Sequence, residues 1–294
     1  MKKVIITQLT GGLGNQLFQY AIAKAIAVKN GVPMKIDLSF FKDYKWHAYS
    51  LAPFNIDENF ASAQECNDLL NPSLSLFSRG LNKLTKKEKQ SYKLEEKGFA
   101  YDRSNLEEAP PKYMIGYWQS EKYFTSIEKT IRKDFEVKIP PSEQNQKILD
   151  EIIKTNSVSI HIRRGNYVSD EVINNFHGTC SMEYYENAIS YIKEKVDNPI
   201  FYIFSNDIPW SREHLNFEGT KVFVDVNDDT TDYEDLRLMQ NCKHNIIANS
   251  TFSWWAAWLN SNPSKTIIAP KQWFANADMQ NQIQDLIPEK WIRI

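Results

Sequence analysis

The chain has 294 residues, of which 42% are hydrophobic and 24% charged, a composition typical of a globular protein with a substantial core. This length suits one large domain or two of ordinary size. The formal net charge of −2 provides no positive field that would attract nucleic acid or an anionic membrane. Cys66, Cys180 and Cys242 are scattered and odd in number, which favours a reducing compartment over a disulfide framework or a zinc site.

The apolar stretches do not have the pattern of a membrane span. The run from Val4 to Ile6 is soon interrupted by polar and glycine residues, so it is too short for a signal peptide. A long uncharged stretch, residues 245–264, carries four asparagines and a proline, which are unsuited to a transmembrane helix. We therefore expect a cytoplasmic protein without a transmembrane segment, with peripheral association at the inner face of the membrane as an option.

The first 38 residues predict a βαβ unit. Residues 3–8 form a short β-branched run, and apolar side chains recur at helical spacing over 16–30. Gly31 is expected to end this helix, and Pro33 leads into a second strand over 34–38. Residues 40–112 are less regular, with a capping box at Ser62–Glu65 before a short helix. A strand over 113–117 and a helix over 121–135 are expected to close this half.

Pro140 and Pro141 mark a junction, after which strands and helices alternate. Strands are expected over 157–162, 200–205, 221–226, 245–248 and 266–269. Helices are expected over 142–154, 181–196, 209–215, 232–242 and 251–260. Such alternation predicts a parallel sheet covered by helices on both faces. We therefore predict two α/β domains, 1–141 on the acceptor side and 142–294 on the nucleotide side, with a cleft between them and ligands beyond the carboxyl ends of the strands.

A glycine-rich turn separates the first predicted strand from the first helix. Glycines let backbone amides approach a phosphate closely, and the helix N-terminus behind them favours negative charge. The candidate phosphate-binding residues here are Gly11, Gly12, Gly14, Asn15 and Gln16. A dinucleotide fingerprint is an alternative because Asp37 ends the second strand, but its third glycine falls on Leu17. A tight turn without a ligand is another alternative.

Two arginines and a histidine lie at the end of the strand predicted over 157–162. Alternation places His161 and Arg163 on one face of the strand, and Arg164 follows. Burying this cluster would be costly without an anion, and a planar guanidinium group matches a diphosphate. Arginines paired with acids at a domain junction are the alternative interpretation.

A third candidate segment follows the strand predicted over 245–248. Its hydroxyls open a helix, where they can cap the helix or, after a parallel strand, form a second phosphate site. The candidate residues are Asn249, Ser250, Thr251, Phe252 and Ser253. The tryptophans that follow, Trp254, Trp255 and Trp258, are expected to lie in the core and not to serve as sugar-binding platforms.

Three motifs together resemble the bacterial α-1,2-fucosyltransferases of glycosyltransferase family 11. They are Gly11–Ala21 (GGLGNQLFQYA), His161–Val168 (HIRRGNYV) and Asn249–Leu259 (NSTFSWWAAWL). The resemblance implies a GT-B-type α/β fold of two Rossmann-like domains, GDP-fucose as donor, inversion at the anomeric carbon, and a galactose-containing glycan of an oligosaccharide or surface polysaccharide as acceptor. It also implies that Arg163 binds the β-phosphate and that His161 and an acid matching Asp235 hold the guanine.

One position departs from that family pattern, because Asn166 stands where the family usually has aspartate and asparagine cannot accept a proton. The nearby Glu171 and Asp170 are the candidate catalytic bases, with solvated loop acids as the alternative. The chain contains no Asp-x-Asp motif, so we expect no metal or other cofactor, and the diphosphate charge is assigned to Arg163 and to helix-terminal donors. A different fucosyl linkage, a Rossmann-like NAD(P)-dependent oxidoreductase and a non-catalytic carbohydrate-binding protein are the alternative functions.

Overall fold

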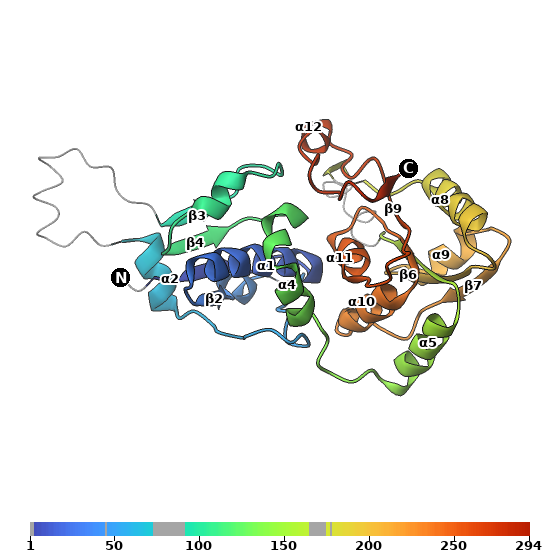
Figure 1. Ribbon diagram of the computed structural model, residues 1–294, viewed down its shortest axis with the longest axis horizontal. Coiled ribbons are helices and arrows are strands. Elements are labelled where there is room, and N and C mark those ends of the chain that lie inside the picture. The colour runs from blue at the N-terminus through green and yellow to red at the C-terminus, as the bar shows by residue number, and fades with distance from the viewer. Residues whose placement is uncertain (1–2, 45, 73–91, 165–174, 177) are drawn as a thin grey trace, which may run out of the picture. The chain divides into compact units, whose positions relative to one another are not determined.

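The computed structural model describes residues 3–44, 46–72, 92–164, 175–176 and 178–294. The chain divides into two compact units, an N-terminal unit of residues 1–52 with 56–134 and a C-terminal unit of residues 53–55 with 135–294. Figure 1 labels their helices and strands. The division falls between Asp134 and Phe135, on the N-terminal side of the proline pair at which a boundary was expected.

The N-terminal unit opens with the predicted βαβ unit. β1 (Ile5–Gln8), α1 (Leu13–Asn30) and β2 (Met34–Asp37) follow one another, and α1 packs against both strands. Gly31 ends α1 in the left-handed conformation with φ 61°, which glycine adopts without steric cost. β3 (Lys93–Glu95) and β4 (Lys112–Ile115) complete a parallel sheet of order β2-β1-β4-β3. β3 has three residues, one of them buried, so its sequence pattern is too short to predict it.

Short helices complete this unit. The capping box before α2 (Ala63–Leu70) is confirmed, because Ser62 and Glu65 each accept a hydrogen bond from the other's backbone amide. The helix expected over 121–135 is wrong in its first part, where η3 (Glu121–Tyr123) and η4 (Thr125–Ile127) precede α4 (Glu128–Asp134). Phe124 separates them because its backbone leaves the helical region at φ −133°. Two further 3-10 turns are η1 (Ser39–Lys42) and η2 (Arg103–Glu107).

The C-terminal unit follows the predicted alternation of strands and helices. Its elements are α5 (Glu143–Lys154), β5 (Ser157–Ile162), α8 (Met182–Lys195), β6 (Ile200–Ser205), α9 (Ile208–His214), β7 (Thr220–Phe223), α10 (Asp232–Asn241), β8 (His244–Ile246), α11 (Thr251–Leu259), β9 (Ile267–Ala269), α12 (Ala277–Gln280) and β10 (Ile292–Arg293). The strands form a parallel sheet of order β10-β9-β8-β5-β6-β7. The prediction of a GT-B-type α/β fold with two parallel sheets is confirmed.

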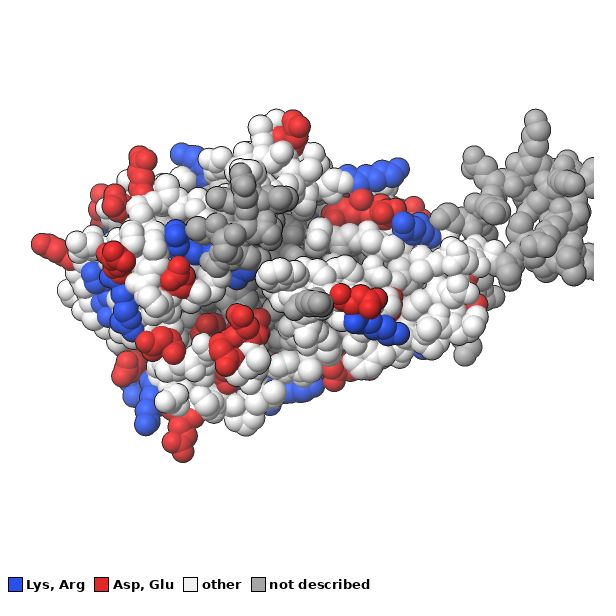
Figure 2. All heavy atoms as spheres, turned by 180° about the vertical axis from the view of Figure 1, so that it is seen from behind, with Lys and Arg blue, Asp and Glu red and all other residues white. Residues whose placement is uncertain are grey.

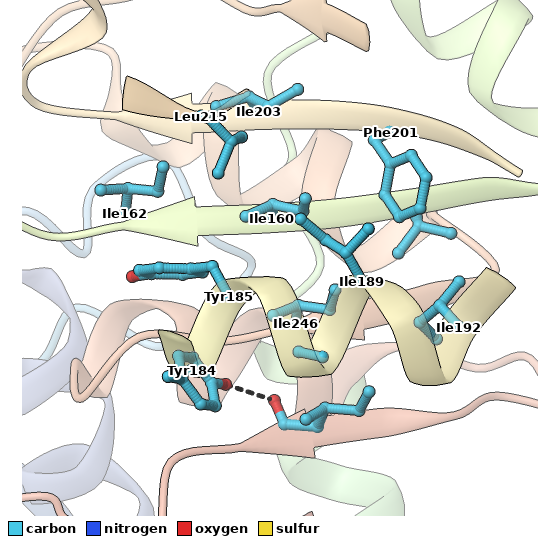
Figure 3. Packing of buried hydrophobic residues seen from close by; sticks show 13 residues of the cluster. Ile160, Ile162, Tyr184, Tyr185, Ile189, Ile192, Phe201, Ile203, Leu215 and Ile246 are labelled. Atoms are coloured by element: carbon cyan, nitrogen blue, oxygen red, sulfur yellow. Dashed lines mark hydrogen bonds between the residues drawn. The ribbon is translucent and has the colours of Figure 1, made fainter. Parts of the chain in front are cut away.

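The core of the C-terminal unit encloses β5, in which two serines and a histidine alternate with valine and isoleucines. Every residue of β5 is buried, as expected for a parallel strand that is covered on both faces. On one face, side chains of α8 pack against β5 and β6 (Figure 3). The Tyr184 hydroxyl donates to the carbonyls of Ile247 at 2.6 Å and Ile268 at 3.2 Å, the second of which is drawn dashed in Figure 3. α8 is thereby joined to the backbone of the sheet.

The tryptophans of α11 lie in the core of the C-terminal unit, as predicted. Trp254 and Trp255 are fully buried, and Trp258 is 5% exposed. The Trp254 indole donates to the carbonyl of Leu286 at 2.8 Å, which satisfies its one polar group. These rings therefore pack α11 and cannot bind sugar at the surface.

Charged side chains of both signs are interspersed over the face drawn in Figure 2. The sequence contains 35 basic and 37 acidic residues, so this mixture is expected. Among the described residues, no helix is long and apolar enough to cross a membrane.

Candidate active site

The strand order of the C-terminal sheet reverses between β5 and β8. After β5 the chain adds β6 and β7 on one side, and it then places β8, β9 and β10 on the other. In open parallel sheets, ligands bind beyond the carboxyl ends of the strands at such a reversal. Arg163 and Arg164 follow β5 directly, and residues 249–253 lead from β8 into α11. Arg163, Arg164 and residues 249–253 therefore lie at the position where sheets of this kind bind ligands.

His161 of β5 lies against Phe252 of α11. Its side chain lies on β5, and its ring centroid is 5.5 Å from that of Phe252 in α11. His161 is 5% exposed, and burial together with the charge of Arg163 lowers its pKa to about 3. The imidazole is therefore neutral near pH 7 and is a poor proton acceptor. Nδ1 is buried and has no hydrogen-bond partner among the described residues, so His161 is suited to hydrogen bonding and not to general-base catalysis.

The two adjacent arginines have different surroundings. The Arg164 guanidinium carbon lies 3.6 Å from the centroid of the Trp210 ring, and its Nε is 3.6 Å from Asp207 Oδ2. The Arg164 amide also donates to Asn206 Oδ1 at 2.9 Å. Arg163 is partly exposed at the carboxyl end of β5, and its charge acts on His161. Arg164 therefore contacts the residues that follow β6, and Arg163 is the better candidate for contact with a diphosphate.

Two candidates after β8 are engaged with the protein itself. The Asn249 amide nitrogen donates to the carbonyls of Gly178 at 3.1 Å and Trp273 at 3.0 Å, so it holds two loops together. Ser253 is fully buried, and its hydroxyl lies 3.3 Å from the carbonyl of Ser250.

The other residues of this segment are better placed to contact a ligand. Ser250 precedes α11 as its N-cap and is 8% exposed. Thr251 and Phe252, in the first turn, are partly exposed. The first turn of a helix offers unpaired amides to an anion, and these residues therefore remain the candidates for donor binding in this motif.

Asp235 lies in the first turn of α10 and is held by an asparagine pair. Asn227 Nδ2 donates to Asp235 Oδ1 at 2.7 Å and to Asn145 Oδ1 at 3.0 Å, while Asn145 Nδ2 donates to Asn227 Oδ1 at 2.7 Å. Burial raises the pKa of Asp235 to about 6, although the hydrogen bond from Asn227 acts in the opposite direction. Burial also raises the pKa of the neighbouring Asp232 to about 7. A partly buried, oriented carboxylate of this kind is suited to recognition of a ligand with paired N–H donors.

The glycine-rich turn lies in the N-terminal unit, between β1 and α1. Gly11 has φ 70°, and Gly12 is the N-cap of α1. A Cβ atom on Gly12 would lie 3.3 Å from the His47 ring, so the backbone is closely approached here. Gln16 is fully buried, and its amide donates to the carbonyls of Gly11 at 2.9 Å and Ala48 at 2.8 Å. Gln16 therefore supports the turn from within.

Two further residues of the turn also lie against protein groups. Asn15 Oδ1 accepts a hydrogen bond from Gln119 Nε2 at 3.1 Å, and Gly14 is buried in the first turn of α1. The proposed contact of this turn with a phosphate stays a prediction.

Asp37 does not have the surroundings that a ribose-binding acid requires. Its Oδ2 accepts hydrogen bonds from the hydroxyls of Tyr113 and Ser39, and its Oδ1 accepts from the Ser39 amide at 2.9 Å. Both carboxylate oxygens are therefore occupied. This occupancy removes the residue that made a dinucleotide-binding alternative attractive.

Some predicted residues lie outside the described part of the chain. Glu171, Asp170 and Asn166 belong to residues 165–174, so the assignment of the catalytic base stays a prediction. Within the described residues, no group of three or more His, Cys, Asp or Glu side chains could hold a metal ion.

Sequence reasoning missed Asn227, Asn145 and Trp210. The two asparagines are 82 positions apart and come together only in the folded chain, so no local motif reveals them. Trp210 follows the strand end marked by Asn206, but an aromatic residue there carries no signal of its contact with Arg164.

Comparison with known proteins identifies the family. The family model described as glycosyl transferase family 11 matches residues 2–294. The chain is 36% identical to an α-1,2-colitosyltransferase of Escherichia coli, over 99% of each chain. It is 31% identical to the O-antigen biosynthesis glycosyltransferase WbnK of Escherichia coli, over 97% of this chain and 99% of that one.

A similarity to an animal enzyme covers part of each chain. The galactoside α-(1,2)-fucosyltransferase 2 of Bos taurus is 29% identical over 50% of this chain and 44% of its own length. The whole-chain match to the family model, together with the motifs assembled at the carboxyl ends of β5 and β8, shows that the protein is a glycosyltransferase that belongs to family 11.

Proposed function

We propose that this enzyme transfers L-fucose from GDP-fucose to the 2-hydroxyl of a galactose residue in an oligosaccharide or surface polysaccharide, with inversion at the anomeric carbon. The observation that carries the proposal is the position of Arg163. It follows the central strand β5 at the reversal of strand order, where sheets of this kind bind nucleotides. Its planar guanidinium group can form a bidentate contact with the leaving diphosphate.

Recognition of guanine is assigned to Asp235. The carboxylate can accept hydrogen bonds from N1–H and the exocyclic N2–H₂ of guanine, whereas adenine and uracil present a different donor pattern at the matching edge. Asn227 fixes the Oδ1 atom of this carboxylate at 2.7 Å, so its orientation is set before the nucleotide arrives. Preorganisation of this kind lowers the cost of ordering the site on binding.

Charge stabilisation on the leaving GDP is assigned to Arg163 and the first turn of α11. The departing β-phosphate gains negative charge in the transition state, and fixed donors stabilise that charge without reorganisation. The acceptor hydroxyl must lose its proton, and His161 is unsuited to this step because its pKa is about 3. Glu171, with Asp170 as the alternative, is the proposed base.

The linkage is proposed from relatives that are named for different transferred sugars but for the same α-1,2 linkage. The bacterial colitosyltransferase and the bovine fucosyltransferase are both named as α-1,2 enzymes, and the bovine enzyme is named for a galactoside acceptor. These names support transfer to a 2-hydroxyl.

A second donor sugar is favoured by one specific observation. The relative that is 36% identical over the whole chain is named for colitose, which is the 3-deoxy analogue of L-fucose. A site that hydrogen-bonds the 3-hydroxyl rejects an analogue without it by about 10⁴–10⁵, whereas an apolar pocket discriminates by only about 10–200-fold. The ratio of kcat/KM for GDP-fucose and GDP-colitose therefore decides between the two donors.

The decisive experiment combines thermal shift with product analysis. GDP and the correct GDP-sugar should raise the melting temperature, because a ligand at 100 times its Kd stabilises the fold by about 2.7 kcal/mol. Asp235→Asn should lose this shift. NMR of the product of a galactoside acceptor should show a new α-1,2 linkage. Equal stabilisation by UDP-galactose, or transfer to another hydroxyl, would overturn the proposal.

A further inference from the structure

The N-terminal unit exposes an aromatic side chain that the proposed donor site does not use. Trp46 is 74% exposed, more than any other large hydrophobic residue described. Tryptophan is normally well buried, and aromatic residues left at a surface often mark binding sites. Trp46 lies on the segment that leaves β2 at its carboxyl end, so the surroundings of that strand end show what it could bind.

The N-terminal sheet reverses its strand order between β1 and β4. β2 lies on one side of β1, and β4 and β3 lie on the other. Three chain segments leave the sheet at this carboxyl edge: the glycine-rich turn after β1, residues 38–44 and 46–50 after β2, and residues 116–119 after β4. The rule that places ligands at such reversals therefore applies to this unit as well.

Two buried glutamines of α1 hold these three segments together. Gln16 bonds to the carbonyls of Gly11 and Ala48 at 2.9 and 2.8 Å, which joins the turn after β1 to the segment after β2. Gln19 donates to the carbonyl of Gly116 at 3.0 Å and to Thr10 Oγ1 at 2.8 Å, which joins the turn to the segment after β4. The edge is therefore a fixed surface built from three segments.

Aromatic side chains gather along this edge. The Tyr44 ring lies 4.6 Å from Phe40 and 6.2 Å from His47, and Tyr117 stacks on Phe99 with centroids 6.3 Å apart. Burial raises the pKa of Tyr117, and the charges of Tyr44 and Glu96 raise it further. Rings combined with hydroxyl groups suit a neutral sugar, which presents C–H faces for stacking and hydroxyls for hydrogen bonds.

The turn after β4 carries backbone strain and two unsatisfied polar atoms. Trp118 has φ 58°, an unusual conformation for a tryptophan, and Glu96 holds it by accepting the amides of Tyr117 and Trp118 at 2.6 and 2.9 Å. Gln119 is 7% exposed and bonds through Nε2 to Asn15. Among the described residues, Gln119 Oε1 and Trp118 Nε1 are buried without a hydrogen-bond partner. Unsatisfied polar groups of this kind are rare in folded proteins, and these two lie beneath the surface of the edge.

We propose that this acceptor platform, formed by Tyr44, Trp46, His47 and Tyr117, binds a neutral sugar ring of the acceptor glycan, with Trp46 stacking on the sugar. The assignment of the sugar as part of the acceptor rests on the proposed function. The platform lies in the N-terminal unit and Asp235 lies in the C-terminal unit, so substitutions can separate acceptor binding from donor binding.

The experiment compares Trp46→Ala with Trp46→Tyr, which keeps an aromatic ring, and with Ile153→Ala, which removes a 58% exposed apolar side chain from α5. Saturation-transfer NMR with a galactose-containing oligosaccharide measures binding without a donor, and steady-state kinetics measure both KM values. Trp46→Ala should raise the KM for the acceptor about 3- to 10-fold, the effect of losing one aromatic contact. The KM for the GDP-sugar should not change, and Trp46→Tyr and Ile153→Ala should resemble the wild type.

Several results would overturn this inference. Undiminished oligosaccharide binding by Trp46→Ala would show that Trp46 is not a platform, and so would a wild-type protein that binds no galactoside. A rise in the donor KM would assign the surface to the donor, and a change in sedimentation of Trp46→Ala would assign it to a second copy of the chain. The proposed function is tested separately, because the thermal shift of the wild-type protein with GDP does not depend on the Trp46 variants.

Discussion

The affinity of the enzyme for GDP-fucose should fall steeply below pH 6. Guanine can use Asp235 only as the carboxylate, because N1–H and N2–H₂ are both donors. Burial raises the pKa of this carboxyl to about 6, so a proton competes with the nucleotide in the weakly acidic range. The KM for the donor should be constant above about pH 7 and should rise about tenfold per pH unit well below pH 6.

Asn227 should determine the pH below which the KM for the donor rises. Its hydrogen bond to Oδ1 lowers the pKa of Asp235 against the larger effect of burial. A hydrogen bond to a charged group contributes about 1.5–3 kcal/mol, which corresponds to about one to two pKa units. Asn227→Ala should therefore move the midpoint of the KM profile from near pH 6 to about pH 7–8, with a smaller effect on kcat.

The assay is the KM for GDP-fucose between pH 5 and 9 at saturating acceptor. Asp235→Asn should bind the donor weakly, and its KM should not rise further at low pH. Asp232→Asn should keep the rise of KM at low pH, although the pKa of Asp232 is itself raised to about 7. His161 does not titrate in this range, since its pKa is about 3. If the KM of Asp235→Asn for the donor rises below pH 6 as it does in the wild type, Asp235 does not hold the guanine.

The same shift affects the stability of the unliganded protein. The folded-state pKa of Asp235 lies above its ordinary value of 3.8, so the folded protein holds a proton that the unfolded chain has already lost. The contribution of this carboxyl is therefore present below about pH 4 and is lost as the pH rises through about 6. GDP should offset this loss, and thermal melts with and without GDP should diverge as the pH rises from 5 to 7.

Three further predictions concern the transfer step. Arg163→Lys should lower kcat/KM by about 10²–10³, because lysine keeps the charge but loses the bidentate contact. Arg164→Lys should lower kcat/KM by less. If Arg164→Lys has the larger effect, Arg164 is the residue that contacts the phosphate. Glu171→Gln should lower kcat more than Asp170→Asn with GDP binding unchanged, and near-wild-type kcat in both variants would exclude both acids as the base. Activity should survive EDTA, and its complete loss with recovery on addition of manganese would contradict the assignment of the diphosphate to Arg163 and helix-terminal donors.

The regular half of the chain could be predicted because its signals are local. β5 and β6 have the bounds expected from the alternation of strands and helices, which is the pattern of a parallel sheet covered by helices. β3 and β10 could not be predicted, because segments of three and two residues exist only by pairing with longer neighbours. The helix expected over 121–135 failed at Phe124, where the backbone departs from the helical region and the apolar spacing does not reveal it.

The candidate site shows a different limit of sequence reasoning. Gln16, Asn249 and Ser253 were interpreted as ligand contacts, but they form hydrogen bonds to backbone carbonyls of the protein. A motif reports that a residue type is needed at a position and does not separate contact with a ligand from support of the chain that makes the contact. The partners of these side chains lie in loops distant in sequence, so the distinction needs the folded structure.

The buried amides explain how this protein can keep irregular loops fixed at the carboxyl ends of its strands. Loops there expose carbonyls that no strand neighbour satisfies, and an unsatisfied buried carbonyl costs about 1–3 kcal/mol. Gln16 and Asn249 each supply two donors from one uncharged group, which bonds two carbonyls without burying a charge. A lysine would bring a charge into the core and a serine only one donor. The amide is therefore the side chain that can join two loops at each reversal of strand order.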